Sequence, residues 1–218
     1  MKLNWVEKLL MNNPVRAAVQ RHYEAPLLER LGGRVEGGRV LEVGCGRGIG
    51  TEIIFEHFGA QYIEAFDLDP DMVGRALYRL DRYVPDRLRL RVGDVTAIDA
   101  EDGSFDAVFD FAIIHHVPHW QAAISEIARV LRSGGRFFFE EVTTRALNRW
   151  SYRTFLKHPK ENRFSTAEFI HELEAQGIGV GGNWVERVFG DFVIGVGNRV
   201  RNERSIETKE SLHYAISS

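Results

Sequence analysis

The feature that most constrains the fold is an abrupt change from apolar residues to glycine between residues 40 and 50. Val40, Leu41 and Val43 form a short apolar run, and glycines follow at positions 44, 46, 48 and 50. Residues with helical periodicity come directly after them. This order indicates a strand, a tight turn and the start of a helix, as at the ligand-binding edge of an α/β sheet. Glycine in such a turn adopts positive φ angles and lets the backbone approach a ligand closely.

Two other classes of glycine-rich loop are inconsistent with these residues. A dinucleotide-binding fingerprint that begins at Gly44 requires a small residue at position 49, where this chain has Ile49. A phosphate-binding P-loop requires Gly-Lys-Ser/Thr, which does not follow the glycines. The loop therefore argues against an NAD-dependent reductase and against a P-loop protein.

Short apolar strands alternate with amphipathic helices after this loop. Ile124, Ile127 and Ala128 follow the spacing of one helix face, and Asp69 followed by Pro70 is a typical helix start. Such an alternation requires a parallel sheet with helices on both faces. The predicted strands are 39–43, 62–67, 87–92, 105–111 and 136–140, and the predicted helices are 48–58, one from Asp69 onward, and 119–132.

Both ends of the chain differ from this alternating part. Apolar stripes predict helices over 3–31 with a break at Asn12-Asn13-Pro14, which gives an N-terminal helical cap over 1–33. Near the other end, Ser165 and Glu168 fit a capping box, while 178–188 and 192–198 predict two strands of an antiparallel hairpin. Residues 200–218 form a polar tail, for which a frayed end and a short helix both stay open.

Composition bounds the class of protein. A chain of 218 residues fits one decorated domain, and a net charge of −3 gives no general case for a nucleic-acid partner. The single cysteine, Cys45, excludes an internal disulfide and is interpreted as a small residue of the loop. No apolar run approaches the ~20 residues of a membrane-spanning helix, and no signal-peptide pattern is evident, so a cytoplasmic location is expected.

Five further segments follow the loop in order. They are Phe-Asp-Leu-Asp-Pro-Asp-Met at 66–72, Gly-Asp-Val at 93–95, Phe-Asp-Ala-Val-Phe-Asp at 105–110, Ile-His-His-Val at 114–117, and Glu-Ile-Ala-Arg-Val-Leu-Arg-Ser-Gly-Gly at 126–135. Together with the form E-x-G-C-G-x-G at 42–48, they resemble the class I S-adenosylmethionine-dependent methyltransferases. The resemblance extends to about residue 141, and it is greatest to the small-molecule methyltransferases of ubiquinone and menaquinone biosynthesis.

This resemblance implies a Rossmann-like, doubly wound α/β fold with a seven-stranded sheet. The sheet would be mostly parallel with one antiparallel C-terminal strand, and the methyltransferase domain would cover 34–199 after the N-terminal helices. The resemblance also implies S-adenosyl-L-methionine as the cofactor and a small-molecule acceptor.

By the same resemblance, successive strands end in cofactor contacts. Asp67 would accept hydrogen bonds from both ribose hydroxyls, with Leu68 beside the adenine and Met72 close by. Asp94 would accept from the adenine amino group, and Val95 would offer its backbone N–H to the ring.

The methionine end of the cofactor would lie over the glycine loop. Glu42 would help to hold it, and Asp110 and Phe111 would lie beside the methionine and its methyl group. An acid at position 110 departs from the small polar residue that many relatives carry. The expected loop contacts are Gly44, Cys45, Gly46 and Gly48.

Three histidines gather at positions 115, 116 and 119. No metal site is predicted, because no Glu or Cys partner is apparent. The usual imidazole pKa of ~6.5 suits a general base, so His115 and His116 are the candidate catalytic residues. Packing or capping in the loop is the alternative, and Glu140 and Glu141 are candidates to face the acceptor.

Basic residues recur between 142 and 164. Arg145, Arg149, Arg153 and Lys157 are four residues apart, so a helix would align them on one face, with aromatic side chains between them. This segment is interpreted as a lid over the acceptor site, suited to an anionic, aromatic or lipid-like acceptor. Peripheral contact with a membrane surface and a merely solvated helix face are the alternatives.

The main hypothesis is methyl transfer to a small organic acceptor. Nucleic-acid methylation is disfavoured, because Asp-Phe-Ala-Ile-Ile-His-His stands where base-methylating relatives carry Asn/Asp-Pro-Pro-aromatic. A non-catalytic protein that binds S-adenosylmethionine is a further alternative. The sequence defines neither the acceptor nor the oligomeric state.

Overall fold

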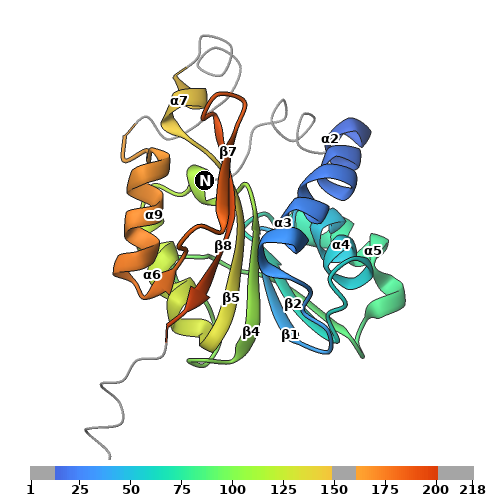
Figure 1. The fold of residues 1–218 in the computed structure, drawn as a ribbon. Helices are drawn as coiled ribbons and strands as arrows, with labels where there is room; N and C mark the ends of the chain where they lie inside the picture. Colours follow the sequence, from blue (N-terminus) through green and yellow to red (C-terminus); the bar gives the residue numbers. More distant parts are fainter. Residues whose placement is uncertain (1–12, 149–160, 201–218) are drawn as a thin grey trace, which may run out of the picture.

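The computed structural model describes residues 13–148 and 161–200, and a single β-sheet runs through its centre (Figure 1). Five strands lie parallel to one another in this sheet. The strand order is β3-β2-β1-β4-β5-β8-β6. The chain therefore adds β2 and β3 on one side of β1 and then crosses back to add β4 and β5 on the other side. The parallel strands are β1 (Arg39–Val43), β2 (Tyr62–Asp67), β3 (Leu88–Val92), β4 (Phe105–Phe111) and β5 (Leu131–Val142).

The C-terminal strands complete the sheet on the β5 side. β8 (Phe192–Arg199) runs antiparallel to β5, and β6 (Ile178–Gly179) and β7 (Trp184–Arg187) both run antiparallel to β8. β8 is therefore the described strand that opposes the rest, which confirms the predicted α/β class with one reversed strand. The strand count differs, because the sheet has eight strands instead of the predicted seven.

The extra strand arises within the predicted strand 178–188. A turn separates β6 from β7, and Gly181 in that turn has a φ of +55°. A left-handed residue cannot continue an extended strand, so the backbone leaves the sheet and re-enters it. The predicted hairpin connection at 189–191 does join β7 to β8.

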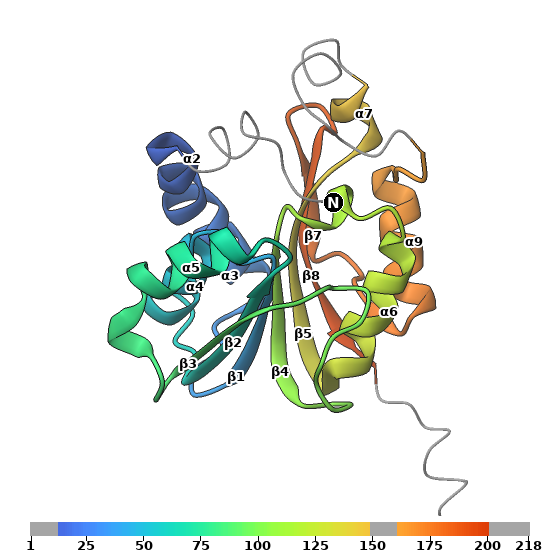
Figure 2. The same ribbon diagram turned by 180° about the vertical axis from the view of Figure 1, so that it is seen from behind.

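Helices cover both faces of the sheet (Figures 1 and 2). On one face, the core includes Phe58, Phe109 and Phe138, whose rings are in edge-to-face or stacked contact. On the other face, Trp120 and Phe169 belong to a second core. The helices of the first face are α3 (Ala25–Gly32), α4 (Ile49–Glu56) and α5 (Pro70–Arg79), and those of the second are α6 (Trp120–Val130) and α9 (Thr166–Ala175).

Local capping explains where several helices begin. The side chain of Asp69 accepts a hydrogen bond from the backbone N–H of Asp71, and Pro70 is the first helical residue of α5. Ser165 and Glu168 form the predicted capping box at the start of α9. The predicted helix 119–132 ends earlier, at Val130, because Leu131 already pairs with Phe105 as the first residue of β5.

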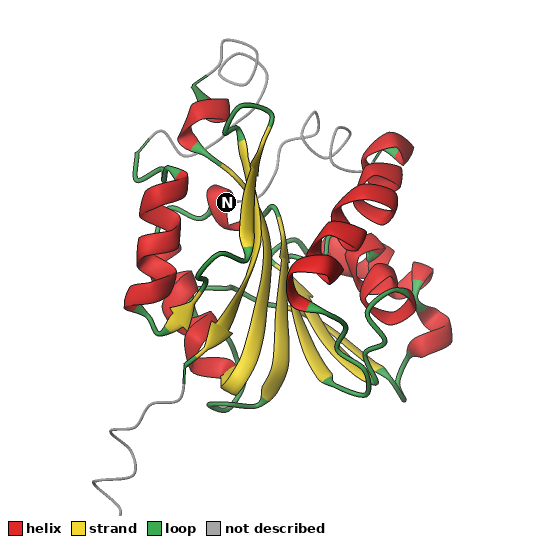
Figure 3. Ribbon diagram, viewed as in Figure 1, coloured by secondary structure: helices red, strands yellow, loops and turns green. Residues whose placement is uncertain are grey.

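Short elements connect this framework (Figure 3). The N-terminal part is one helical run of α2 (Pro14–Val19), the π-helix η1 (Gln20–Glu24) and α3. The others are the 3₁₀-helices η2 (Asp81–Tyr83) and η3 (Ile114–His116), and α7 (Thr144–Leu147). Predictions for 1–12, for the basic segment 149–160 and for the tail 201–218 lie outside the described residues. Within the described ranges, no helix has the length and apolarity needed to cross a membrane.

Candidate functional site

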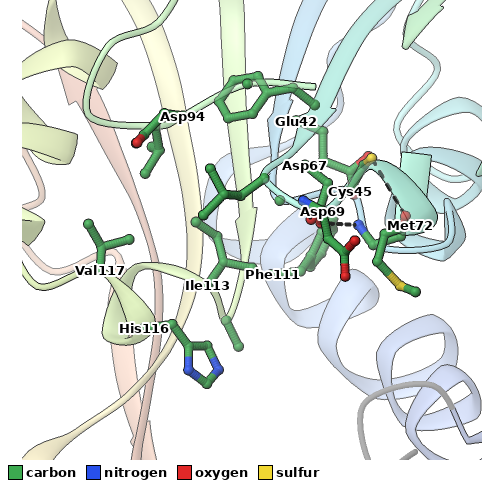
Figure 4. A pocket seen from close by; sticks show the side chains of 18 of the residues that line it. Glu42, Cys45, Asp67, Asp69, Met72, Asp94, Phe111, Ile113, His116 and Val117 are labelled. Atoms are coloured by element: carbon green, nitrogen blue, oxygen red, sulfur yellow. Dashed lines mark hydrogen bonds between the residues drawn. The ribbon is translucent and has the colours of Figure 1, made fainter. Parts of the chain in front are cut away.

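A pocket of about 270 Å³ lies where the parallel strands reach their carboxyl ends. Ligands of open α/β sheets bind at this edge, next to the point where the strand order reverses. Figure 4 shows Asp67, Asp69 and Met72 on one side of the pocket, and Asp94, Val117 and His116 on the other. The lining residues that follow β1 to β4 include Gly44, Cys45, Gly46, Asp67, Leu68, Gly93, Asp94, Val95, Phe111 and Ala112.

The glycine loop after β1 forms one wall of this pocket. Gly44 has a φ of +71°, and a Cβ atom placed there would lie 2.5 Å from Cγ2 of Ile113. Gly44 is therefore required both by its backbone conformation and by the close approach of the loop after β4. Gly48 has a φ of +86° and precedes α4, but it does not line the pocket.

Cys45 is buried in the loop and lines the pocket. Burial, together with the nearby carboxylates of Glu42 and Asp67, raises the pKa of its thiol well above the usual value. The thiolate is the reactive form of cysteine, so these surroundings disfavour a nucleophilic role of Cys45.

The carboxylate of Asp67, at the end of β2, is tied to the loop backbone. It accepts hydrogen bonds of 2.9 Å from the backbone N–H groups of Gly46 and Asp69 (Figure 4). Each carboxylate oxygen can accept a further bond, so Asp67 is both positioned by the backbone and able to accept from a ligand. Leu68 and Met72 line the pocket next to it.

Asp94 and Val95 line the pocket after β3. Oδ1 of Asp94 accepts hydrogen bonds from the backbone N–H and the hydroxyl of Thr96, at 2.9 Å and 2.8 Å. These two bonds fix the orientation of the carboxylate at the pocket wall.

Glu42 is the most buried acidic residue that lines the pocket. Burial raises the pKa of its carboxyl to about 8, against a partial opposing effect of the Thr51 hydroxyl that donates a hydrogen bond to it. A Cβ atom at Gly50 would lie 2.1 Å from Oε1 of Glu42, so the glycine makes room for this carboxyl.

The structure separates Asp110 from Phe111, because successive side chains of a strand point to opposite faces. Phe111 lines the pocket, whereas Asp110 is fully buried behind it and accepts a hydrogen bond from the backbone N–H of Ile113. Burial, and then the nearby carboxylate of Glu141, raises the pKa of Asp110 well above its usual value.

The two candidate catalytic histidines have different surroundings. His116 lines the pocket, while His115 lies outside the lining and its Nδ1 is 2.6 Å from Oε2 of Glu141. Their ring centroids are 4.1 Å apart. His119 also lines the pocket. In the described part of the chain, no three His, Cys, Asp or Glu side chains are grouped so as to hold a metal ion.

Residues 41–139, which run from within β1 into β5 and include these strand ends, match the sequence profile of the methyltransferase domain family. These residues carry a methyltransferase domain, and the comparisons support its place in the class I S-adenosylmethionine-dependent type. S-adenosylmethionine is the cofactor of such a domain.

Curated relatives match about half of this chain. The ubiquinone biosynthesis O-methyltransferase of Xanthomonas oryzae pv. oryzae is 42% identical over 104 residues, which is 47% of this chain and 42% of that protein. The fatty-acid O-methyltransferase of Mycolicibacterium smegmatis is 34% identical over 111 residues, which is 51% of this chain and 39% of that protein. The matches thus span less than half the length of these relatives.

The fold of the methyltransferase domain is shared with solved structures. A SAM-dependent methyltransferase from Aquifex aeolicus superposes with a TM-score of 0.70 at 21% identity, over 92% of this chain and 100% of that one. At this level of identity the comparison shows the fold alone.

The pocket of the methyltransferase domain fits the cofactor by its chemistry. S-adenosylmethionine carries ribose hydroxyls and an adenine amino group, which need acceptors, and the carboxylates of Asp67 and Asp94 stand at neighbouring strand ends. Gly44 and Gly50 leave space free in the pocket wall. A Cβ atom would lie 2.5 Å from another side chain at position 44 and 2.1 Å from another side chain at position 50.

Several polar residues of the pocket wall were not predicted as site residues, among them Arg16, Gln20, Arg47, Asp69 and Thr96. Arg16 and Gln20 line the pocket from the N-terminal helices, and Arg47 lines it from the glycine loop. Arg47 could have been inferred from its place between two loop glycines. Arg16 and Gln20 are four residues apart and so share a helix face, but no sequence pattern shows that this face meets the strand ends.

Proposed function

We propose that this chain transfers a methyl group from S-adenosylmethionine to a small organic acceptor. The observation that carries the proposal is that the glycine loop, Asp67, Asp94 and His116 line one pocket, with His116 across from Asp67. The two relatives compared above are named for ubiquinone biosynthesis and for fatty acids, and both are O-methyltransferases. A small, partly apolar acceptor with a nucleophilic oxygen suits such a pocket.

In this proposal, each polar group holds one part of the cofactor. Asp67 accepts from the ribose hydroxyls, Asp94 accepts from the adenine amino group, and the loop around Gly44 lies against the methionine end. Domain boundaries at 34 and 199, with residues 1–33 as a helical cap and 142–164 as a lid, belong to the same proposal. When bound, the cofactor supplies an electrophilic methyl group on a positively charged sulfur.

The acceptor side requires positioning and removal of a proton. Alignment of two bound reactants lowers the barrier for a displacement at carbon. An oxygen nucleophile gains from proton removal as the new carbon–oxygen bond forms and the carbon–sulfur bond breaks, with its electron pair left on sulfur. His116 is the proposed proton acceptor, because its imidazole lines the pocket beside Phe111 and Ile113. His115 and Glu141 lie behind it and position it.

Calorimetric titration of the full chain with S-adenosylhomocysteine tests the proposal. NAD⁺ and ATP serve as matched adenosine-containing controls, since they share the adenine and ribose but carry phosphates in place of the amino-acid group. We expect saturable binding of S-adenosylhomocysteine and at least about tenfold weaker binding of both controls. Absence of S-adenosylhomocysteine binding, or equal binding of all three, would overturn the assignment.

A further inference from the structure

Gln20 presents its amide group to the pocket, and none of the described residues forms a hydrogen bond with it. The residue as a whole is only 7% exposed, so little besides the pocket can reach it. The amide therefore offers a donor and an acceptor to a ligand in the pocket. Gln20 is also the first residue of a π-helix, a backbone form that is frequent at functional sites.

Arg16 lies one helical turn before Gln20 and lines the same pocket. Its Nη2 is 3.0 Å from Oε2 of Glu140, and its Nη1 donates to Oε2 of Glu24. Neither of these two carboxylates is among the lining residues, so they hold the guanidinium from behind. A guanidinium has more N–H donors than these two contacts use, and the remaining donors are available toward the pocket.

The environment of Glu24 lowers the negative charge beside Arg16. Burial, and then the nearby carboxylate of Glu140, raises the pKa of Glu24 to about 9, which favours the neutral form of this carboxyl. Less negative charge beside the guanidinium favours the binding of an anion there.

The strand that Arg16 contacts indicates the end of the pocket at which Arg16 and Gln20 lie. Asp94, Asp67 and Gly44 follow β3, β2 and β1, which are neighbouring strands in that order. Arg16 instead contacts Glu140 of β5, whose register partner in β4 is Phe111. Neighbouring strands are about 4.8 Å apart, so Arg16 lies roughly 10 Å beyond the glycine loop, on the side away from Asp94.

From this placement we infer that Arg16 and Gln20 form a subsite for the carboxylate of an acceptor with an apolar body. The adjoining wall is apolar, because Phe111, Ala112, Ile113 and Val117 line it. A bidentate or charge-assisted contact from Arg16 and a donated N–H from Gln20 match the two oxygens of a carboxylate. The inference rests on the proposed function, and it adds the chemical class of the acceptor.

A matched pair of probes tests this subsite in the full chain. Octanoate and 1-octanol have the same chain length and differ in the carboxylate, and each is titrated into protein saturated with S-adenosylhomocysteine. The variants are Gln20→Leu, which removes the amide at similar size, and Gln20→Glu, which adds a negative charge. Val15→Ala on the same helix is the control, since Val15 is 73% exposed and does not line the pocket.

We expect wild type and Val15→Ala to bind octanoate at least about tenfold more tightly than 1-octanol. Gln20→Leu should weaken octanoate binding about tenfold, a loss of about 1.4 kcal/mol, and Gln20→Glu should weaken it further. Binding of 1-octanol and of S-adenosylhomocysteine should stay unchanged in both variants. Unchanged binding of these ligands also shows that both variants are folded.

Four results would overturn the subsite. Octanoate binding can be absent in wild type, equal to that of 1-octanol, or unaffected by Gln20→Leu. Weakened S-adenosylhomocysteine binding with unchanged octanoate binding would also overturn it, because Gln20 would then serve the carboxylate of the cofactor. Failure of S-adenosylhomocysteine to bind wild type would instead refute the proposed function itself, so the two failures are distinguishable.

Discussion

The imidazole Nδ1 of His115 lies 2.6 Å from the carboxylate Oε2 of Glu141, at the inner side of the pocket wall. The same carboxylate accepts hydrogen bonds from the backbone N–H groups of Ile114 and His115, at 2.6 Å and 3.1 Å. Glu141 is fully buried, so these bonds replace the water that its charge would otherwise require. One side chain of β5 therefore holds the 3₁₀-helix that carries His116 to the pocket.

Replacing this carboxylate should loosen the 3₁₀-helix η3. In Glu141→Gln, an amide NH₂ must replace one oxygen and would face groups that are themselves donors. We expect a loss of about 2 kcal/mol in the free energy of unfolding, measured by chemical denaturation. Glu174→Gln, an exposed substitution on α9, is the control and should change stability by less than about 0.5 kcal/mol. Equal stability of the two variants would show that Glu141 does not hold η3.

The glycine loop allows a comparison between two residues that share a backbone conformation. Gly44 and Gly46 both have positive φ, at +71° and +52°, but only a Cβ atom at Gly44 would clash, at 2.5 Å from Ile113. A Cβ atom at Gly46 would have no neighbour within 4 Å. We expect Gly46→Ala to cost about 1 kcal/mol of stability, from backbone strain alone. Gly44→Ala should cost at least about 2 kcal/mol more in thermal or denaturant unfolding, because overpacking adds to that strain.

Local patterns predicted the helix starts and the alternation of strands and helices well, because short-range contacts decide them. The Asp69–Pro70 start of α5 and the Ser165–Glu168 capping box depend on residues within one helical turn. The division of 178–188 into two strands depended on the turn around Gly181, which a hydrophobic pattern does not reveal.

The candidate site was predicted where a residue follows a strand directly. Asp67, Asp94 and the loop glycine Gly44 meet at one edge because parallel strands end on the same side of a sheet. Gln20 was missed because its place depends on how the N-terminal helices pack against β5 and β8, and long-range packing leaves no trace in local spacing. The strand alternation that buries Asp110 behind Phe111 could have been read from the sequence.

The carboxylate of Asp67 should contribute strongly to cofactor binding. In Asp67→Asn, the side chain keeps its size but loses the charge and one acceptor oxygen, so the bonds to the ribose hydroxyls weaken. We expect affinity for S-adenosylhomocysteine to fall about 10- to 100-fold by calorimetry, which corresponds to roughly 1.4 to 2.7 kcal/mol. Asp71→Asn is the matched control on the first turn of α5, because Asp71 does not line the pocket. Similar losses in both variants would remove Asp67 from the cofactor site.

Glu42 should make the stability of the free protein depend on pH. Burial raises the pKa of its carboxyl from the usual 4.5 to about 8 in the folded chain. Between these two values the folded state keeps a proton that the unfolded state has released. The stabilising contribution is therefore fully present below pH 4.5 and is lost as the pH rises toward and through 8.

Glu42→Gln removes this titration and keeps a group that can form a hydrogen bond with the Thr51 hydroxyl. The free energy of unfolding of this variant should therefore lack the decrease that ionisation of Glu42 causes as the pH rises. We expect the free energy of unfolding of Glu42→Gln, relative to wild type, to rise by about 1 to 4 kcal/mol between pH 5 and pH 9. Denaturant unfolding at both pH values measures that difference, and the Glu174→Gln variant corrects for general effects of pH. A constant difference between Glu42→Gln and wild type across this range would mean that Glu42 is already ionised in the folded protein, and that the pocket holds its charge without a ligand.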